Sequence, residues 1–175
     1  MENQNTLKII IVGEGGVGKS SLLNRYVNDI FDPSSSLTKG VGFFNKKIKY
    51  NGNGKEYNAV FWDFGGQSQF RFMLPNFLGG AVGIILTFDL TRFNSMMQVD
   101  NWMQELNKHV DLPILLVGTK NDLDTCLDQE YLEEHVANLI QNHDKIIGFI
   151  KTSAKDNINV RDTFNKLIGH LLDNN

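Results

Sequence analysis

The stretch IVGEGGVGKSS, Ile11–Ser21, places four glycines, a lysine and two serines directly after an apolar, strand-like run. Residues Gly13–Ser20 fit the pattern G-x-x-x-x-G-K-S/T, in which a loop joins a strand to a helix. Glycines let backbone N–H groups surround a diphosphate because no Cβ blocks the approach, and the following helix adds the positive end of its dipole. We interpret the stretch as a phosphate-binding loop; the alternative is a glycine-rich turn that binds nothing.

Strand-like apolar runs alternate with segments of helical periodicity along the rest of the chain. Two further strand-like segments flank NGNG, a strong signal for a hairpin turn. This order predicts one α/β domain over residues 1–175, with a mostly parallel six-stranded sheet, one antiparallel edge strand and helices on both faces. Ligands bind at the carboxyl ends of such strands. Here those ends read GEGGVGKSS, WDFGGQ, FDLT, GTKND and KTSAK.

The composition narrows the class of protein. The chain has 175 residues, a net charge of −3 and one cysteine, Cys126. This charge argues against a broad nucleic-acid-binding face, and a single cysteine excludes an internal disulfide. We therefore expect a cytoplasmic protein without a nucleic-acid partner. We also expect it to be a monomer. Glu2 leaves no glycine to myristoylate and the end GHLLDNN has no cysteine to prenylate, so we expect no membrane anchor in this chain; a tail or partner outside it could attach it to membranes.

The motif GTKNDL, which follows the apolar run PILLV, points to the base of a nucleotide. The Asp122 carboxylate could accept two hydrogen bonds from the adjacent N–H and NH₂ groups of guanine, an edge that adenine lacks. The aliphatic stem of Lys120 could cover the base plane. The motif TSAK, Thr152–Lys155, ends the next strand, where a backbone N–H could reach the guanine oxygen. Each motif is weak evidence by itself. Because both occur downstream of a phosphate loop, together they favour a guanine nucleotide.

With these motifs the chain resembles the Ras-like small GTPases, most of all the Rab-like branch, over residues 6–172. The matching segments are GEGGVGKSS, Thr38 in LTKGVGF, WDFGGQ, GTKNDL and TSAK. The resemblance implies a P-loop GTPase fold that binds GTP or GDP with Mg²⁺. The nucleotide contacts that it implies come from Gly13, Gly15, Gly16, Val17, Gly18, Lys19, Ser20, Ser21, Phe31, Thr38, Gly66, Thr119, Lys120, Asp122, Ser153, Ala154 and Lys155.

The resemblance also implies two switch loops, at about residues 31–42 and 63–80. The residues that would hold Mg²⁺ are Ser20, Thr38 and Asp63. The catalytic residues would be Lys19, Thr38 and Gln67. Among these, Gln67 would orient the attacking water, while the backbone N–H groups of Thr38 and Gly66 would bind the γ-phosphate.

The expected function is hydrolysis of GTP to GDP, coupled to ordering of the two loops by the γ-phosphate. Charge-assisted hydrogen bonds of about 1.5–3 kcal/mol each are enough to bias such loops. The segment FDPSSSLTKG has no arginine, so we expect slow intrinsic hydrolysis and dependence on an activating protein, together with an exchange factor and effectors. The alternatives are a module that holds nucleotide without hydrolysing it, and an ATP-using P-loop kinase, which would need an arginine-rich lid.

Some residues depart from the family pattern. The second switch reads DFGGQS where D-T-A-G-Q-E is usual, so Phe64 adds an apolar ring and Gly65 adds backbone freedom. Thr119 replaces the commoner asparagine of the base motif, and Gly42 stands where Rab proteins usually have aspartate. We expect Trp62 to be a core residue rather than a ligand-binding one.

Overall fold

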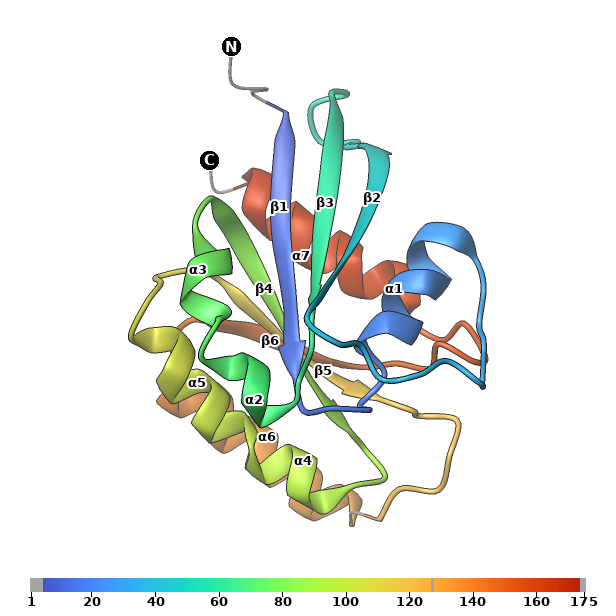
Figure 1. Cartoon of the computed structure of the whole chain (residues 1–175), viewed down its shortest axis with the longest axis vertical. Coiled ribbons are helices and arrows are strands. Elements are labelled where there is room, and N and C mark those ends of the chain that lie inside the picture. The colour runs from blue at the N-terminus through green and yellow to red at the C-terminus, as the bar shows by residue number, and fades with distance from the viewer. Residues whose placement is uncertain (1–4, 127, 174–175) are drawn as a thin grey trace.

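The structure is a computed structural model that describes residues 5–126 and 128–173 (Figure 1). Its elements, in chain order, are β1 (Thr6–Gly13), α1 (Lys19–Asn28), β2 (Val41–Lys49), β3 (Glu56–Phe64), α2 (Ser68–Arg71), α3 (Leu74–Leu78), β4 (Ala81–Asp89), α4 (Phe93–Met97), α5 (Val99–Asn107), β5 (Ile114–Thr119), α6 (Gln129–Asn142), β6 (Ile146–Lys151) and α7 (Val160–Asp173).

The six strands form one sheet in the order β2-β3-β1-β4-β5-β6. β2 pairs antiparallel with β3, and every other neighbouring pair is parallel. The expected α/β fold with a single antiparallel edge strand is therefore confirmed, and NGNG lies in the turn of the β2–β3 hairpin. Side chains of β2 alternate between exposed and half-buried, as an edge strand should, whereas all six residues of the central strand β5 are buried.

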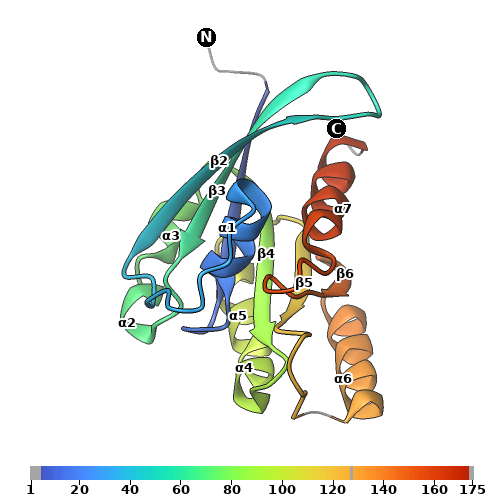
Figure 2. The same ribbon diagram turned by 90° about the vertical axis from the view of Figure 1, so that its right-hand side faces the viewer.

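Helices cover both faces of the sheet, as expected, and divide the core into two clusters (Figures 1 and 2). On one face, Ile9 and Ile11 of β1 belong to a cluster with residues of α1 and α7. On the other, Ile10 and Val12 belong to a cluster with residues of α3, α4, α5 and α6. Successive side chains of a strand point to opposite faces, so the unbroken apolar run of β1 supplies both clusters. None of the helices among the described residues is long and apolar enough to cross a membrane.

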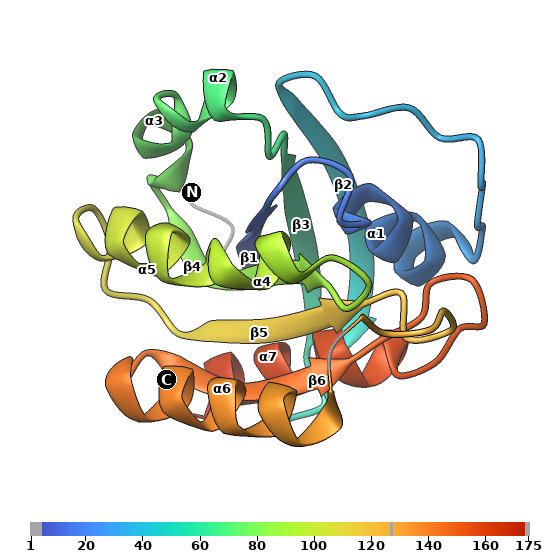
Figure 3. The same ribbon diagram turned by 90° about the horizontal axis from the view of Figure 1, so that it is seen from below.

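The carboxyl ends of the parallel strands meet at one edge of the sheet, which Figure 3 shows from below. At this edge β1 ends at Gly13, whose φ of 141° is in the region that favours glycine. A Cβ on Gly13 would collide with the carbonyl oxygen of Thr87 in β4. Glycine therefore lets the chain turn into the phosphate loop without separating β1 from β4.

Three aromatic rings pack together on the face of the sheet that α1 and α7 cover. The Phe164 ring stacks on Tyr26 at a centroid distance of 3.8 Å and meets Phe61 edge-on at 5.2 Å. We expect Phe164→Ala to lower the free energy of unfolding by about 3–5 kcal/mol, because it leaves a cavity in a fully buried site. Urea denaturation measures this change. Phe72→Ala is the matched control, since that side chain is 77% exposed; an equal loss in both variants would contradict the prediction.

Candidate nucleotide site

A pocket of about 380 Å³ opens at the carboxyl edge of the sheet. Its walls come from the phosphate loop, the start of α1, the loop before β2, the segment after β3, and the segments after β5 and β6. Most of the residues predicted from the sequence line it. These are Gly15, Gly16, Gly18, Lys19, Ser20, Ser21, Phe31, Thr38, Gly66, Gln67, Thr119, Lys120, Asp122, Ala154 and Lys155.

The other four predicted residues, Gly13, Val17, Asp63 and Ser153, are buried behind these walls. The Val17 carbonyl oxygen accepts a hydrogen bond from the Thr119 hydroxyl, whose oxygen also lies 3.0 Å from the Phe88 carbonyl oxygen, so the two carbonyls share one donor. Thr119 thus fastens the phosphate loop to β4, a task for which a hydroxyl is sufficient.

The Lys19 side chain is 5% exposed although it carries an ammonium group. Its Nζ donates to the carbonyl oxygens of Gly13, at 2.9 Å, and Glu14, at 2.7 Å. Burial lowers the pKa of Lys19 to about 8, although the nearby charges of Asp63 and Glu14 act to raise it. A buried cation held mainly by neutral carbonyl groups is suited to an anionic ligand, which would compensate its desolvation.

Three oxygen-bearing side chains meet beside Lys19. The Ser20 hydroxyl donates to Oδ2 of Asp63 and lies 2.6 Å from the Thr38 hydroxyl, which itself donates to the same carboxylate oxygen at 3.2 Å. The Asp63 carboxylate is 1% exposed, and its Oδ1 has no hydrogen-bond partner among the residues described. Two hydroxyls, one carboxylate and an unpaired buried oxygen fit Mg²⁺, which takes one or two carboxylates and completes its shell with phosphates and water.

The segment after β3 lies directly against the phosphate loop. A Cβ on Gly66 would collide with the carbonyl oxygen of Gly13 and with the backbone of Glu14. Gln67 is equally near, since a Cβ on Gly15 would lie 3.5 Å from its Cγ. The two predicted switch loops also touch each other, because the Gly65 N–H donates to the Gly40 carbonyl oxygen at 2.8 Å.

The far end of the pocket contains the residues predicted to recognise the base. The Ser153 hydroxyl donates to Oδ1 of Asp122 at 2.7 Å and accepts the N–H of Asp156 at 2.9 Å. Ser153 therefore orients the Asp122 carboxylate. Lys120 has a positive φ of 60°, an unfavourable conformation for lysine that the surrounding backbone imposes at this site.

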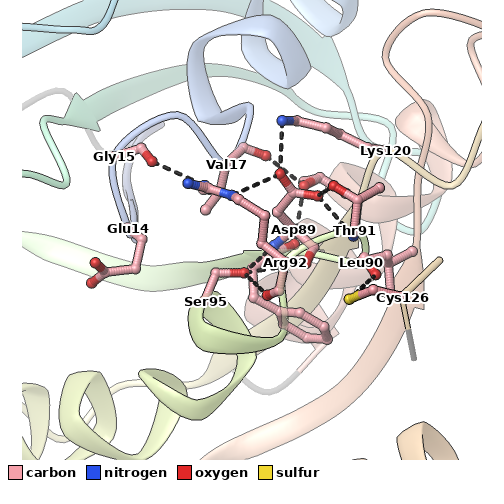
Figure 4. A network of polar contacts seen from close by, with 12 residues as sticks. Glu14, Gly15, Val17, Asp89, Leu90, Thr91, Arg92, Ser95, Lys120 and Cys126 are labelled. Carbon is pink, nitrogen blue, oxygen red and sulfur yellow. Dashed lines mark hydrogen bonds and ion pairs between the residues drawn. The ribbon is translucent and has the colours of Figure 1, made fainter. Parts of the chain in front are cut away.

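Two polar networks beside the pocket were not predicted. In one, Arg92 binds both Asp89 and the carbonyl oxygen of Gly15, and Asp89 also pairs with Lys120 at 2.7 Å (Figure 4). In the other, Glu14 accepts hydrogen bonds from Arg71 and from the indole of Trp102. The position of Asp89 at the carboxyl end of β4, in the quoted segment FDLT, is the signal that could have indicated the first network.

The expectation that Trp62 is a core residue is correct only in part. Its ring lies at the edge of a core cluster and is half-buried. Nζ of Lys8 lies over this ring, 3.6 Å from the centroid, and the Phe43 ring meets it at 81° with the centroids 4.8 Å apart. Phe43 is itself 61% exposed, and the Phe77 ring lies 5.6 Å from Trp62. We name Phe43, Trp62 and Phe77 the aromatic patch.

The fold and the phosphate loop define a small GTPase of the Ras type, and comparisons with known proteins agree. The family model described as Ras family matches residues 8–173. The chain therefore belongs to the Ras family.

Its relatives within the family include Rab proteins. Ras-related protein Rab-18-B of Danio rerio is 38% identical over 170 residues, covering 95% of this chain and 80% of the relative. Ras-related protein Rab-18 of Lymnaea stagnalis is 37% identical over 179 residues, covering 98% and 85%. Ras-related protein SEC4 of Saccharomyces cerevisiae is 36% identical over 174 residues, covering 97% and 78%. Ras-family GTPases bind guanine nucleotide and Mg²⁺, in agreement with the composition of the pocket.

The lowered pKa of Lys19 generates a prediction on pH. A bound phosphate would raise this pKa above its value of about 8 in the free protein. The affinity for GDP should then be fully present below pH 8 and fall as the pH rises through 8, by up to about tenfold per unit. Titration calorimetry between pH 7 and 9 measures it. Lys19→Arg, which does not titrate in this range, controls for titration of the base; parallel pH profiles in both proteins would contradict the prediction.

Proposed function

We propose that this protein is a Mg²⁺-dependent GTP switch, built as one domain, that hydrolyses GTP to GDP. The observation that carries the proposal is the convergence of Ser20, Thr38 and Asp63, because they come from three segments far apart in the sequence. Mg²⁺ held by this trio would neutralise charge that develops on the β- and γ-phosphates. Backbone amides of the phosphate loop and the Lys19 ammonium group would bind the diphosphate.

In the proposed reaction a water oxygen forms a bond to the γ-phosphorus while the bond from that phosphorus to the β–γ bridging oxygen breaks. GDP leaves with the electron pair, and inorganic phosphate carries the water oxygen. Gln67 orients the water, a role supported by its position against Gly15. Gly66 brings its N–H to the γ-phosphate, where a side chain would collide with the phosphate loop.

The switch itself rests on the loop before β2. Its residues 32–37 are exposed, including the apolar Leu37, so little burial holds the loop in place. Thr38, at its end, contacts Ser20 and Asp63. Loss of the γ-phosphate would remove bonds to Thr38 and Gly66, leaving the loop with few interactions to offset its entropy.

Slow intrinsic hydrolysis is part of the proposal. The segment Phe31–Gly40 contains no arginine. Two arginines lie near the phosphate loop, but both bind groups of the protein. Arg71 contacts Glu14 and Trp102, and Arg92 contacts Asp89 and the Gly15 carbonyl oxygen. An activating protein that supplies an arginine would raise the rate by about 10³–10⁵. An exchange factor and effectors complete the cycle. We assign the aromatic patch to effectors, because Phe43 and Trp62 each adjoin one switch loop and Phe77 lies in the second. The similarity to Rab proteins supports a role in vesicle traffic.

Gln67→Leu tests the hydrolytic assignment. It should keep GTP binding and lower single-turnover phosphate release by about tenfold or more, because the water loses the group that orients it. A phosphate sensor and a fluorescent GTP analogue measure the two quantities. An unchanged rate in the variant, or no phosphate release from the wild-type protein even with an arginine-bearing activator, would favour a module that only holds nucleotide.

Asp122→Asn tests the assignment of guanine. The variant should lose about 10²-fold or more in affinity for GDP, because an amide cannot accept both base hydrogen bonds, and should gain affinity for xanthosine diphosphate. Titration calorimetry with GDP and with xanthosine diphosphate measures the two affinities. Asp124→Asn, at an exposed position outside the pocket, is the control. Adenine nucleotide bound to the native protein would instead support an ATP-using kinase.

A further inference from the structure

Arg92, which immediately precedes α4, connects two segments that the function requires. Its Nε donates to Oδ2 of Asp89 at 3.0 Å, and its Nη2 donates to the carbonyl oxygen of Gly15 at 2.9 Å (Figure 4). The planar guanidinium group suits this task because its N–H donors point in fixed, divergent directions. One side chain therefore joins the end of β4 to the phosphate loop, 77 residues away in the sequence.

The carboxylate that anchors Arg92 is fully buried and has hydrogen bonds to both oxygens. Oδ1 of Asp89 accepts the N–H and the hydroxyl of Thr91, at 2.9 and 2.6 Å. Oδ2 accepts Arg92 and also Nζ of Lys120, at 2.7 Å. Burial acts to raise the pKa of Asp89, but the hydrogen bonds from Lys120 and Thr91 hold it below its ordinary value. Asp89 is thus a fixed negative charge shared by Arg92 and a lysine of the base motif.

The contact with Gly15 determines the direction of the next peptide N–H. The described chain has no cis peptide bonds, so the Gly15 carbonyl and the Gly16 N–H point in opposite directions across one planar unit. Gly15 and Gly16 both line the pocket, whereas Arg92 does not. A carbonyl directed outward to Arg92 therefore directs the Gly16 N–H into the pocket. The charged donor also polarises the peptide, which makes that N–H a stronger donor.

This peptide lies at the end of the pocket where Gln67 is found. A Cβ on Gly15 would be 3.5 Å from Cγ of Gln67. The same loop holds the phosphate-binding lysine, since Nζ of Lys19 donates to the carbonyl oxygens of Gly13 and Glu14. A change at Arg92 should therefore affect the phosphates and the attacking water.

We propose that Arg92 is a positioning residue for GTP hydrolysis: it holds the Gly15–Gly16 peptide with its N–H towards the phosphates and, through Asp89, couples that peptide to Lys120 at the base. The proposal rests on the proposed function. In this proposal Arg92 contacts neither the nucleotide nor the attacking water, and it acts through the backbone of the phosphate loop.

The test compares wild-type protein with Arg92→Ala and Arg92→Lys. Single-turnover GTP hydrolysis should fall by about tenfold in the alanine variant, while GTP affinity changes by less than about threefold. The hydrolysis rate of the lysine variant should lie between those of the wild-type protein and the alanine variant, because one ammonium group cannot hold Asp89 and Gly15 in the geometry of the guanidinium. Arg161→Ala, at an exposed position on α7 away from the pocket, is the matched control and should behave as wild type.

A second measurement separates positioning from general stability. The Gly16 amide resonance of the GDP-bound protein should move upfield in Arg92→Ala, as its bond to phosphate weakens, and stay in place in Arg161→Ala. An Arg92→Ala protein with wild-type hydrolysis, or with slow hydrolysis and an unmoved Gly16 amide, would overturn the proposal. If the alanine variant does not fold, the lysine variant provides the test. Wild-type GTP hydrolysis by Arg92→Lys would then overturn the proposal. Wild-type protein that neither binds GDP nor hydrolyses GTP would refute the proposed function instead.

Discussion

The buried ammonium group of Lys19 is the constraint on which the rest of the structure depends. Its partners are the carbonyl oxygens of Gly13 and Glu14, both in the same loop, so the loop must curl around the lysine side chain. That curl places Ser20, which follows Lys19, next to Asp63. Folding therefore leaves a buried ammonium group beside the pocket, and an anion bound there would compensate its desolvation. The cost of burying Lys19 is the physical reason to interpret this loop as a binding site rather than a turn.

Much of the fold was predictable from the sequence because it depends on local patterns. Apolar runs such as Leu7–Val12 are too continuous for an edge strand, and the alternation of β2 marks it as the exposed edge. Between β4 and β5 the local pattern is less informative, because the structure has two short helices there, α4 and α5, which meet at Gln98. Val99, Trp102, Met103 and Leu106 recur at helical spacing and are buried on one face of α5. Val110 continues the same spacing but lies beyond the end of the helix, because periodicity indicates a face and not a boundary.

The site was predictable where the motif and the topology agree, and not where side chains meet over long separations. Fifteen of the predicted residues line the pocket, because the parallel sheet brings their loops to one edge. The pairing of Arg92 with Gly15, and of Glu14 with Arg71, spans 77 and 57 residues and leaves no local pattern. Ser153 illustrates the middle case: its motif was recognised, but its hydrogen bond to Asp122 joins two loops 31 residues apart and leaves no local pattern.

The hydrogen bond from Gly65 to Gly40 has a consequence for how partners sense this protein. A Cβ at position 65 would lie 2.8 Å from the Gly40 oxygen and 2.9 Å from the Thr38 oxygen, so the two loops fit edge to edge with no side chain between them. This contact couples the positions of the two loops, so a partner that binds either loop also responds to the position of the other. Glycine in place of the alanine usual in this family thus favours a single concerted transition, which a small binding surface is sufficient to detect.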